Sequence, residues 1–352
     1  MSKKKPAYPI SEKLQDFLNK YNRDIKISVS YDDLLRFAGG INLYDQHDND
    51  TLWLRVYYAE HEREEIMDSL KRVYTVLHSD GNEEILPFLE VASIDYCSFG
   101  NSRPFRVKIK NIYNDNYIHF YVKRADASRI YGLELEHILS PNRINFLIYS
   151  NTLIEEHIAG IPGDEFIKNY LEDCDDVGKA QIAKEFVKFN ERCTILLLGD
   201  MRSYNYVVIP THDFDHIKYK IRAIDFDQQC YEGKLKVYKP HIFKENFKMV
   251  DLVSKMLSTK MIELYRNEER SVLAKRIIAS RSRLKQLMAC MTIDQISTPE
   301  NLHQLRTELY EYTKDLKFKR SKSMGHIVKS ALEFVSRNYE DVSLKRLMQD
   351  RP

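Results

Sequence analysis

The sequence predicts an α+β protein with a mainly antiparallel sheet in its first half and a largely helical second half. Strand-like stretches recur after Leu86: LEVASIDYCSF, FRVKIKNIY and YIHFYVKRA, separated by turn residues rich in Gly, Asn and Ser. From Asn246 onward, amphipathic runs such as FKMVDLVSKML, LAKRIIASRSRLKQLM and GHIVKSALEFV have helical spacing. Together these patterns indicate a sheet-rich part followed by a helical part.

Length and composition limit the class of protein. With 352 residues, 43% hydrophobic and 30% charged, the chain can form two or three packed units. A net charge of +2 favours neither a nucleic-acid nor a membrane partner. The five cysteines are scattered without a C-x-x-C pair, and no apolar run is long enough to span a membrane. We therefore expect a soluble, cytoplasmic protein, and oligomeric state stays open.

Residues 1–85 are expected to form a small accessory α/β unit. A short helix is predicted at Ser11–Tyr21, and the segment Ser30–Asp33 has the pattern of a capping box. The helix after this box should end at Gly39-Gly40. A strand follows at Thr51–Tyr58, and then a charged helix at His61–Leu77.

The sheet-rich part that follows contains a lysine at the end of its third strand. Lys123 ends YIHFYVK, and the predicted helix Ala127–Leu139 carries Glu134 and Glu136. Further strands are predicted at 145–149 and 152–158, followed by helices at 164–174 and 177–191.

Two later stretches carry the side chains best suited to chemistry. Thr194–Val208 and Ile221–Gln228 each contain an apolar run that ends in a polar turn, which predicts a buried strand in each. Asp200 precedes Asn205 by five residues, and Asp225 follows the second apolar run. Carboxylate and amide oxygens are the donors that Mg²⁺ and a reacting hydroxyl require in phosphoryl transfer. The histidines and aspartates of THDFDH, between these stretches, are better explained as a polar hairpin tip than as a metal site.

These motifs resemble those of the protein-kinase-like superfamily. LGDMRSYN is similar to the H-G-D-x-x-x-x-N loop of aminoglycoside and choline phosphotransferases and to the H-R-D-x-x-x-x-N loop of protein kinases. IDFD is similar to their metal-binding D-F-G or D-F-D turn. The resemblance implies a bilobal fold with an antiparallel-sheet N-lobe at 86–158 and a helical C-lobe at 159–352. Residues 1–85 lie outside it.

The resemblance also implies roles for the residues of the two loops. Asp200 would orient or deprotonate an acceptor hydroxyl, and Arg202 would contact the transferring phosphate. Asn205 and Asp225 would hold Mg²⁺. Leu198 replaces the usual His, and Asp227 replaces the Gly of D-F-G, but neither change removes a group that the reaction needs.

A further set of residues is assigned to ATP by the same resemblance. Lys123 would bind the α- and β-phosphates, and Glu134 would fix it, with Glu136 as an alternative partner. Gly100, in the turn SFGNSRPF, would lie near the phosphates. The adenine would be held by the backbone carbonyl of Glu156 and the N–H of Ile158.

Three functions stay open at this point. The first is an ATP- and Mg²⁺-dependent phosphotransferase that acts on a hydroxyl of a small molecule. The second is an atypical, HipA-like Ser/Thr protein kinase, which Arg202 favours and the lack of an A-P-E-like segment disfavours. The third is a nucleotide-binding pseudokinase with a regulatory role, which the single glycine of the phosphate turn and Leu198 favour.

Overall fold

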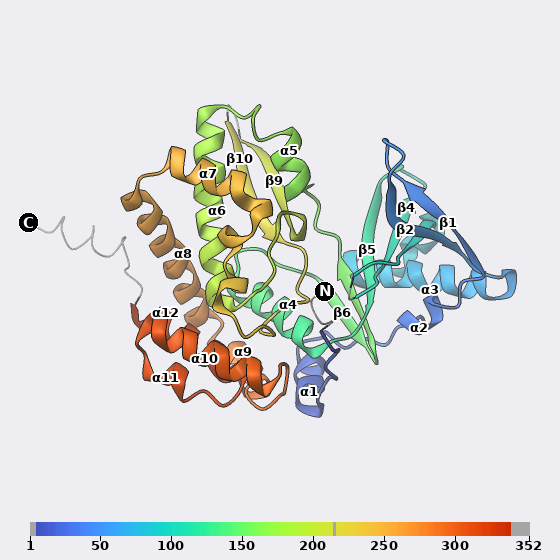
Figure 1. Ribbon diagram of the computed structural model, residues 1–352. Helices are drawn as coiled ribbons and strands as arrows, with labels where there is room; N and C mark the ends of the chain where they lie inside the picture. Colours follow the sequence, from blue (N-terminus) through green and yellow to red (C-terminus); the bar gives the residue numbers. More distant parts are fainter. Residues whose placement is uncertain (1–4, 101, 214–215, 339–352) are drawn as a thin grey trace, which may run out of the picture. The chain divides into compact units, whose positions relative to one another are not determined.

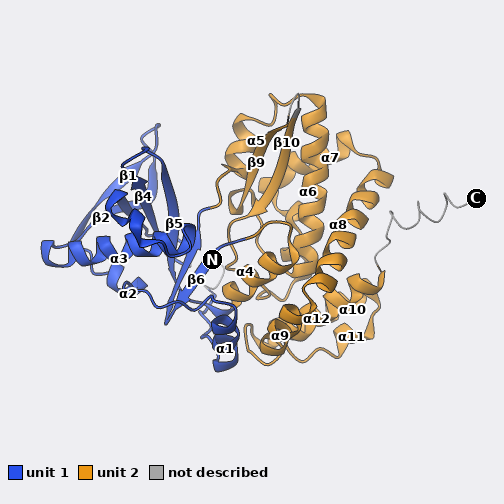
Figure 2. Cartoon of the chain, turned by 180° about the vertical axis from the view of Figure 1, so that it is seen from behind, with its two compact units in different colours: residues 1–127, 144–157 blue, residues 128–143, 158–352 orange. Residues whose placement is uncertain are grey.

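The computed structural model describes residues 5–100, 102–213 and 216–338, and these divide into two compact units. Unit 1 consists of residues 1–127 and 144–157, and unit 2 consists of residues 128–143 and 158–352 (Figure 2). Each unit is therefore built from separate pieces of the chain.

Unit 1 is built on an antiparallel sheet. Within the described ranges, seven strands form this sheet in the order β1-β2-β3-β4-β5-β7-β6. Together with the mainly helical later part of the chain, the sheet confirms the predicted α+β class. The order of three strands, a helix and two strands before the helical part is consistent with the protein-kinase-like fold. The strands are β1 (Gly39–Tyr44), β2 (Asp50–Tyr57), β3 (Leu89–Cys97), β4 (Phe105–Asn111), β5 (Tyr117–Arg124), β6 (Phe146–Tyr149) and β7 (Thr152–Glu156).

One face of this sheet forms the core of unit 1. The helix α3 (Glu60–His78) packs against β3 and β4 (Figure 1). Because side chains alternate along a strand, Val107 and Ile109 of β4 join this core, while Arg106 and Lys108 lie on the opposite face. The sheet is thus apolar on the α3 side and polar on the other side.

Residues 1–85 share the sheet and the core of unit 1. β2 pairs with β3, with Trp53 opposite Cys97, and Val56 and Leu70 pack in the same cluster as Val107. The structure therefore divides the chain differently from the expected boundary at residue 85. Sequence patterns show where strands form, but they do not show which strands pair.

The start of the chain contains short helices and one strand that the sequence did not indicate. α1 (Glu12–Lys20) is capped by Ser11, and the capping box of Ser30 with Asp33 is present at α2 (Tyr31–Leu34). The predicted helix after this box has only these four residues, and Gly39-Gly40 begins β1 instead of ending a helix. A glycine pair is a strong local break in a helix, but it is also compatible with a strand.

Unit 2 is mainly helical. Its central helix α6 packs against α7, α8, α12 and the strand β10 (Figure 1). A small antiparallel sheet joins β10, β9 and β8. The elements of this unit are α4 (Ala127–Leu139), β8 (Ile161–Pro162), α5 (Gly163–Asn169), α6 (Asp176–Leu196), β9 (Tyr206–Asp213), β10 (His216–Ala223), α7 (Phe247–Met256), α8 (Thr259–Ala279), α9 (Arg281–Met291), α10 (Pro299–Thr313), α11 (Leu316–Lys319) and α12 (Met324–Asn338).

The apolar run before Asp200 is not a strand. Ile195 and Leu196 form the last turn of α6, and Leu197 ends the helix with a left-handed φ of 55°. A short apolar run fits a buried strand and a buried helix end equally well, because it has no periodicity to separate them. The prediction of a strand in the second stretch is confirmed, because β10 runs to Ala223.

Helix α4 has the predicted bounds, but its residues group with unit 2 and not with the sheet. Tyr131 donates a hydrogen bond to Asp294 (2.7 Å), and Arg276 Nε donates to the carbonyl of Ile138 (3.2 Å). The expected N-lobe at 86–158 included this helix. Its contacts to α8 and to the segment after α9 explain why it groups with unit 2.

The contact between α12 and the end of α9 leads to a stability prediction. A Cβ added at Gly325 would lie 2.1 Å from the backbone oxygen of Met291. We expect Gly325→Ala to lower the free energy of unfolding by about 1–3 kcal/mol, because two backbones would have to separate. Gly39→Ala is the matched control, since nothing lies within 4 Å of its added Cβ. Equal denaturation midpoints for the two variants would contradict the prediction.

None of the helices within the described ranges combines the length and the apolar character that a membrane crossing requires.

Candidate active site

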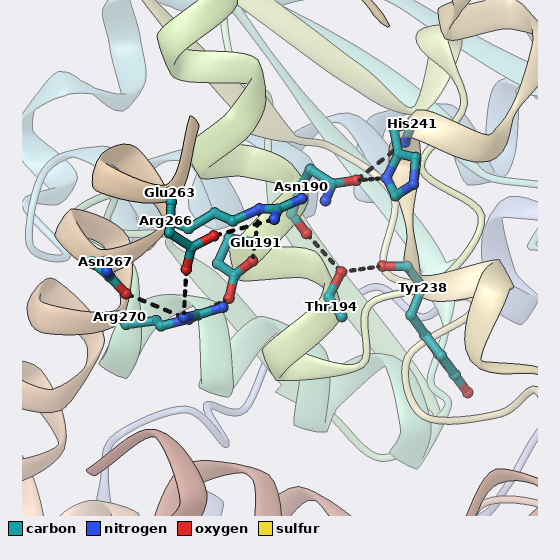
Figure 3. Close-up of polar contacts among 9 residues, drawn as sticks. All are labelled: Asn190, Glu191, Thr194, Tyr238, His241, Glu263, Arg266, Asn267 and Arg270. Atoms are coloured by element: carbon teal, nitrogen blue, oxygen red, sulfur yellow. Dashed lines mark hydrogen bonds and ion pairs between the residues drawn. The ribbon is translucent and has the colours of Figure 1, made fainter. Parts of the chain in front are cut away.

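The helix that leads into the candidate site is held in place by polar contacts on two sides. On α6, Glu191 accepts a hydrogen bond from Arg270 of α8 (2.7 Å), and Asn190 accepts one from the backbone N–H of His241 (3.1 Å) (Figure 3). Thr194 contacts the carbonyl of Tyr238 (3.1 Å). The last turns of α6 are therefore tied both to α8 and to the segment after residue 234.

The loop after α6 is fixed by backbone bonds. Leu198 forms a β-bridge with Gln229, and the N–H of Gly199 donates to the carbonyl of Gln228 (3.3 Å). Asp200 has a left-handed φ of 57°, and its N–H donates to the carbonyl of Val237 (3.1 Å). A non-glycine residue with positive φ persists only where its surroundings hold it, which is frequent at functional sites.

Asn205 is bound to the same loop. Its Nδ2 donates a hydrogen bond to the backbone carbonyl of Asp200 (2.7 Å), and its N–H donates to the carbonyl of Arg202 (2.9 Å). Neither bond uses Oδ1, the oxygen of the same side-chain amide. The loop thus orients an oxygen donor at Asn205.

Asp225 lies beside Asn205 because of the register of the β9–β10 hairpin. Ala223 pairs with Tyr206, and one residue further on the N–H of Ile224 donates to the carbonyl of Asn205 (3.0 Å). Asp225 follows directly, and its Oδ1 accepts a hydrogen bond from the N–H of Asp227 (2.9 Å). Asp200, Asn205 and Asp225 are therefore brought into one region of unit 2 by a hairpin and a hydrogen-bonded loop.

Arg202 is held between two carboxylates. Its Nε donates to Asp200 (2.8 Å), and its Nη1 donates to Glu245 (2.8 Å). Burial alone would lower the pKa of Arg202, but the hydrogen bond and the charge of Asp200 raise it above its ordinary value. Glu245 was not found from the sequence, since nothing in its pattern connects it to a loop much earlier in the chain. Arg202 therefore compensates negative charge at the loop.

The second aspartate of the Asp-Phe-Asp turn has a structural partner. Asp227 forms a buried ion pair with Arg129 of α4, and Ser128 of the same helix donates to the carbonyl of Gln229 (2.6 Å). These contacts bind the turn to α4. They give a physical reason for the carboxylate of Asp227, at the position where the D-F-G turn has glycine.

In unit 1, Lys123 pairs with a neighbouring strand. Its Nζ lies 2.7 Å from Glu155, both side chains are buried, and Oε1 of Glu155 has no hydrogen-bond partner among the described residues. Lys123 lies opposite Leu153 in the β5–β7 ladder, so Lys123 and Glu155 share a face of the sheet. No pattern in the sequence signals this pair, since it depends on strand register.

The predicted partner of Lys123 has its own ion pair in unit 2. Glu134 is fully buried and receives hydrogen bonds from Arg283 Nη2 (2.7 Å) and Nε (3.0 Å). The alternative, Glu136, is buried near Arg192. Burial would lower the pKa of Arg192, but the charge of Glu269 and then that of Glu136 raise it above its ordinary value. A pair between Lys123 and either glutamate would join the two units, and it stays a prediction.

The other residues assigned to ATP are Gly100, Glu156 and Ile158. Gly100 has a φ of 85° in the turn between β3 and β4, and Asn101 of that turn lies outside the described residues. Glu156 is the last residue of β7, and Ile158 is the first residue of unit 2 after the sheet. The adenine contacts assigned to Glu156 and Ile158 stay predictions.

The sheet face that carries Lys123 is polar and aromatic. Tyr121 and His119 lie on this face of β5, opposite Arg106 and Lys108 of β4. Burial and the neighbouring His157 lower the pKa of His119 to about 4. His119 is therefore neutral at pH 7. Among the cations of this face, Arg106 is paired with Asp95 and Lys123 with Glu155.

The described residues of THDFDH end β9 and begin β10, which agrees with the expected hairpin. Asp213 pairs with His216 in the ladder and forms an ion pair with Lys218, whereas Phe214 and Asp215 lie outside the described residues. Across the described ranges, no group of three or more His, Cys, Asp and Glu side chains could hold a metal ion. Mg²⁺ needs no such group, because one carboxylate with amide, water and phosphate oxygens completes its shell. Asn205 and Asp225 fit that requirement.

Comparisons with known proteins leave the family open. The chain matches no protein-family model, and a comparison with curated proteins gives no match. Among solved structures, the chain is similar to an ethanolamine kinase of Plasmodium vivax at 12% sequence identity and a TM-score of 0.31. This similarity covers 78% of the chain and 90% of the ethanolamine kinase. We assign no family from it.

Proposed function

We propose that the protein is an ATP- and Mg²⁺-dependent phosphotransferase that transfers the γ-phosphate to a hydroxyl of a small molecule. The observation that carries this proposal is the β9–β10 ladder, which sets Asn205 beside Asp225 through the bond from Ile224 N–H. The Asn205 side chain in turn holds the carbonyl of Asp200. These contacts support a site in which Asn205 and Asp225 would hold Mg²⁺ close to the Asp200 carboxylate, as phosphoryl transfer requires.

In this proposal each residue of unit 2 has a defined task. Asp200 accepts the proton of the acceptor hydroxyl. The hydroxyl oxygen forms a bond to the γ-phosphorus while the bond from that phosphorus to ADP breaks, and ADP leaves. Asn205 and Asp225 hold Mg²⁺, which neutralises phosphate charge when bound. Arg202 limits the negative charge of the loop through Asp200 and Glu245, and it can contact the transferred group.

Nucleotide binding without turnover is a second candidate function, and the ion pair between Arg202 and Asp200 favours it. One oxygen of the Asp200 carboxylate already accepts a hydrogen bond from Arg202 at 2.8 Å. An acceptor hydroxyl would have to share that oxygen with the guanidinium. Turnover would then require the second oxygen or a movement of Arg202. A protein Ser or Thr as the acceptor is a further variant of the first proposal.

Thermal denaturation with and without Mg-ATP tests nucleotide binding. At 100 times the dissociation constant, a ligand that binds only the folded state stabilises it by about 2.7 kcal/mol. We expect EDTA to reduce this stabilisation in the native protein, and Asp225→Asn to reduce it in the presence of Mg²⁺. Asp213→Asn at the hairpin tip is the matched control and should leave the shift unchanged. No shift at millimolar Mg-ATP would overturn the proposal.

Transfer of ³²P from ATP then separates the acceptors. Label on a member of a panel of hydroxyl-bearing metabolites, and none on protein, supports the small-molecule function. Label on Ser or Thr, either of the protein itself or of an added protein, would support the protein-kinase function in place of the small-molecule function. Stabilisation by Mg-ATP without any transfer supports binding without turnover.

A further inference from the structure

Residues of α8, α9, α11 and α12 in unit 2 line a cavity of about 740 Å³. These four helices are labelled in Figure 1. This volume is within the range of small-molecule binding sites in proteins. None of the residues assigned to phosphoryl transfer lines it. The cavity is therefore distinct from the candidate active site.

The inner surface of this cavity is apolar. Side chains from three helices contribute to it: Ile277, Ile278, Leu284, Met288, Ala289 and Leu332. Ile278 is 65% exposed, so a large aliphatic side chain remains in contact with water at the opening. An apolar ligand that covers these groups gains free energy by removing them from water.

The rim of the cavity carries three cations that have no ion-pair partner within the described part of the chain. Arg281, Lys285 and Lys329 line the opening, all three are exposed, and none forms an ion pair or hydrogen bond with another described residue. The acid at the rim, Glu333, is paired with Lys317. An excess of positive charge therefore remains where a ligand would meet solvent.

An apolar surface beneath unpaired cations matches one chemical class of ligand. We propose that this cavity binds a single-chain anionic amphiphile, namely an aliphatic carboxylate in its free, monomeric form. The alkyl chain lies on the apolar surface, and the carboxylate lies among Arg281, Lys285 and Lys329. A neutral alcohol lacks the charge for the rim, and an inorganic anion lacks the chain for the apolar surface.

Isothermal titration of the full chain with octanoate, decanoate and dodecanoate, below their micelle concentrations, tests this site. Affinity should rise about four-fold per added methylene while the chain is still being buried, because each buried methylene contributes about 0.8 kcal/mol. Dodecanol should bind about ten-fold more weakly than dodecanoate, and added salt should reduce that difference. Affinity independent of chain length, or equal affinity for the alcohol, would overturn the proposal.

Variants locate the binding and identify the source of the ligand. Ala289→Trp should fill the cavity and abolish binding, and replacing Arg281, Lys285 and Lys329 together by Ala should weaken it at least ten-fold. Lys260→Ala, at the other end of α8, is the matched control and should bind as the native chain does. Unchanged binding in Ala289→Trp would overturn the assignment. Flotation with phosphatidylglycerol vesicles in the absence of carboxylate binding would also overturn it, because it would indicate a membrane surface instead.

Discussion

Replacing Asp200 by Asn is expected to lower the rate of phosphoryl transfer by about 10²–10⁴-fold, the usual contribution of a general base. Asn keeps the size of Asp and can still accept a hydrogen bond from Arg202. Asn also adopts positive φ readily, so the left-handed backbone at this position is compatible with it. The variant therefore removes basicity with little effect on the fold. Initial rates at saturating ATP and acceptor measure the loss.

Two controls make this result specific to the candidate site. Asp213→Asn removes an equivalent charge from the exposed end of the β9–β10 hairpin and should retain the native rate. The thermal midpoint of Asp200→Asn should lie close to that of the native protein. A fully active Asp200→Asn would remove this residue from the catalytic proposal. A rate loss with a much lower midpoint would assign it a structural role instead.

Replacing Glu269 by Ala is expected to have the largest effect on stability, about 3–5 kcal/mol. Arg192 of α6 and Glu269 of α8 form a buried ion pair at 2.6 Å, with side-chain exposures of 8% and 5%. Without Glu269, the guanidinium would stay buried with the charge of Glu136 and a hydrogen bond to the carbonyl of Ile221 (3.3 Å) as its remaining compensation. Burying an uncompensated charge costs more than losing the pair itself. Urea denaturation measures the change.

A double variant separates the cost of the isolated charge from the value of the pair. Arg192→Met with Glu269→Leu should recover part of the lost stability, because both charges of the pair are then absent, although the buried Glu136 loses the nearby charge of Arg192. Asp251→Ala breaks an exposed pair with Lys255 and should cost no more than about 1 kcal/mol. If Glu269→Ala behaves like Asp251→Ala, Arg192 reaches water and is not held in a buried charge pair.

The sequence predicted those parts of the fold that depend on local patterns. β4 and β5 follow from alternation of apolar and polar residues, and the bounds of α4 follow from its apolar spacing. The neighbourhood of Asn205 and Asp225 was also expected, because each lies next to a strand of one hairpin. The resemblance of the motifs to kinase loops added roles for these residues but no partners.

What the sequence could not predict depends on register and on packing between distant segments. Glu155 was missed as the partner of Lys123 because only the β5–β7 pairing brings the two side chains to one face. Arg283 was missed as the partner of Glu134 because it comes from α9, a helix much later in the chain. A charged residue in a pattern shows its chemistry, but its partner is decided by tertiary structure.

The interleaving of the two units has a consequence for synthesis on the ribosome. The strands β6 and β7, which complete the sheet of unit 1, are translated only after α4, whose residues belong to unit 2. Until β7 is synthesised, the edge of β5 in the nascent sheet stays unpaired. During the same period α4 cannot pack against α8 and α9, because these helices have not yet been translated. Exposed edges and unburied helices in partly made chains favour aggregation. Chaperone demand during translation should therefore be greatest between the emergence of residue 124 and that of residue 157.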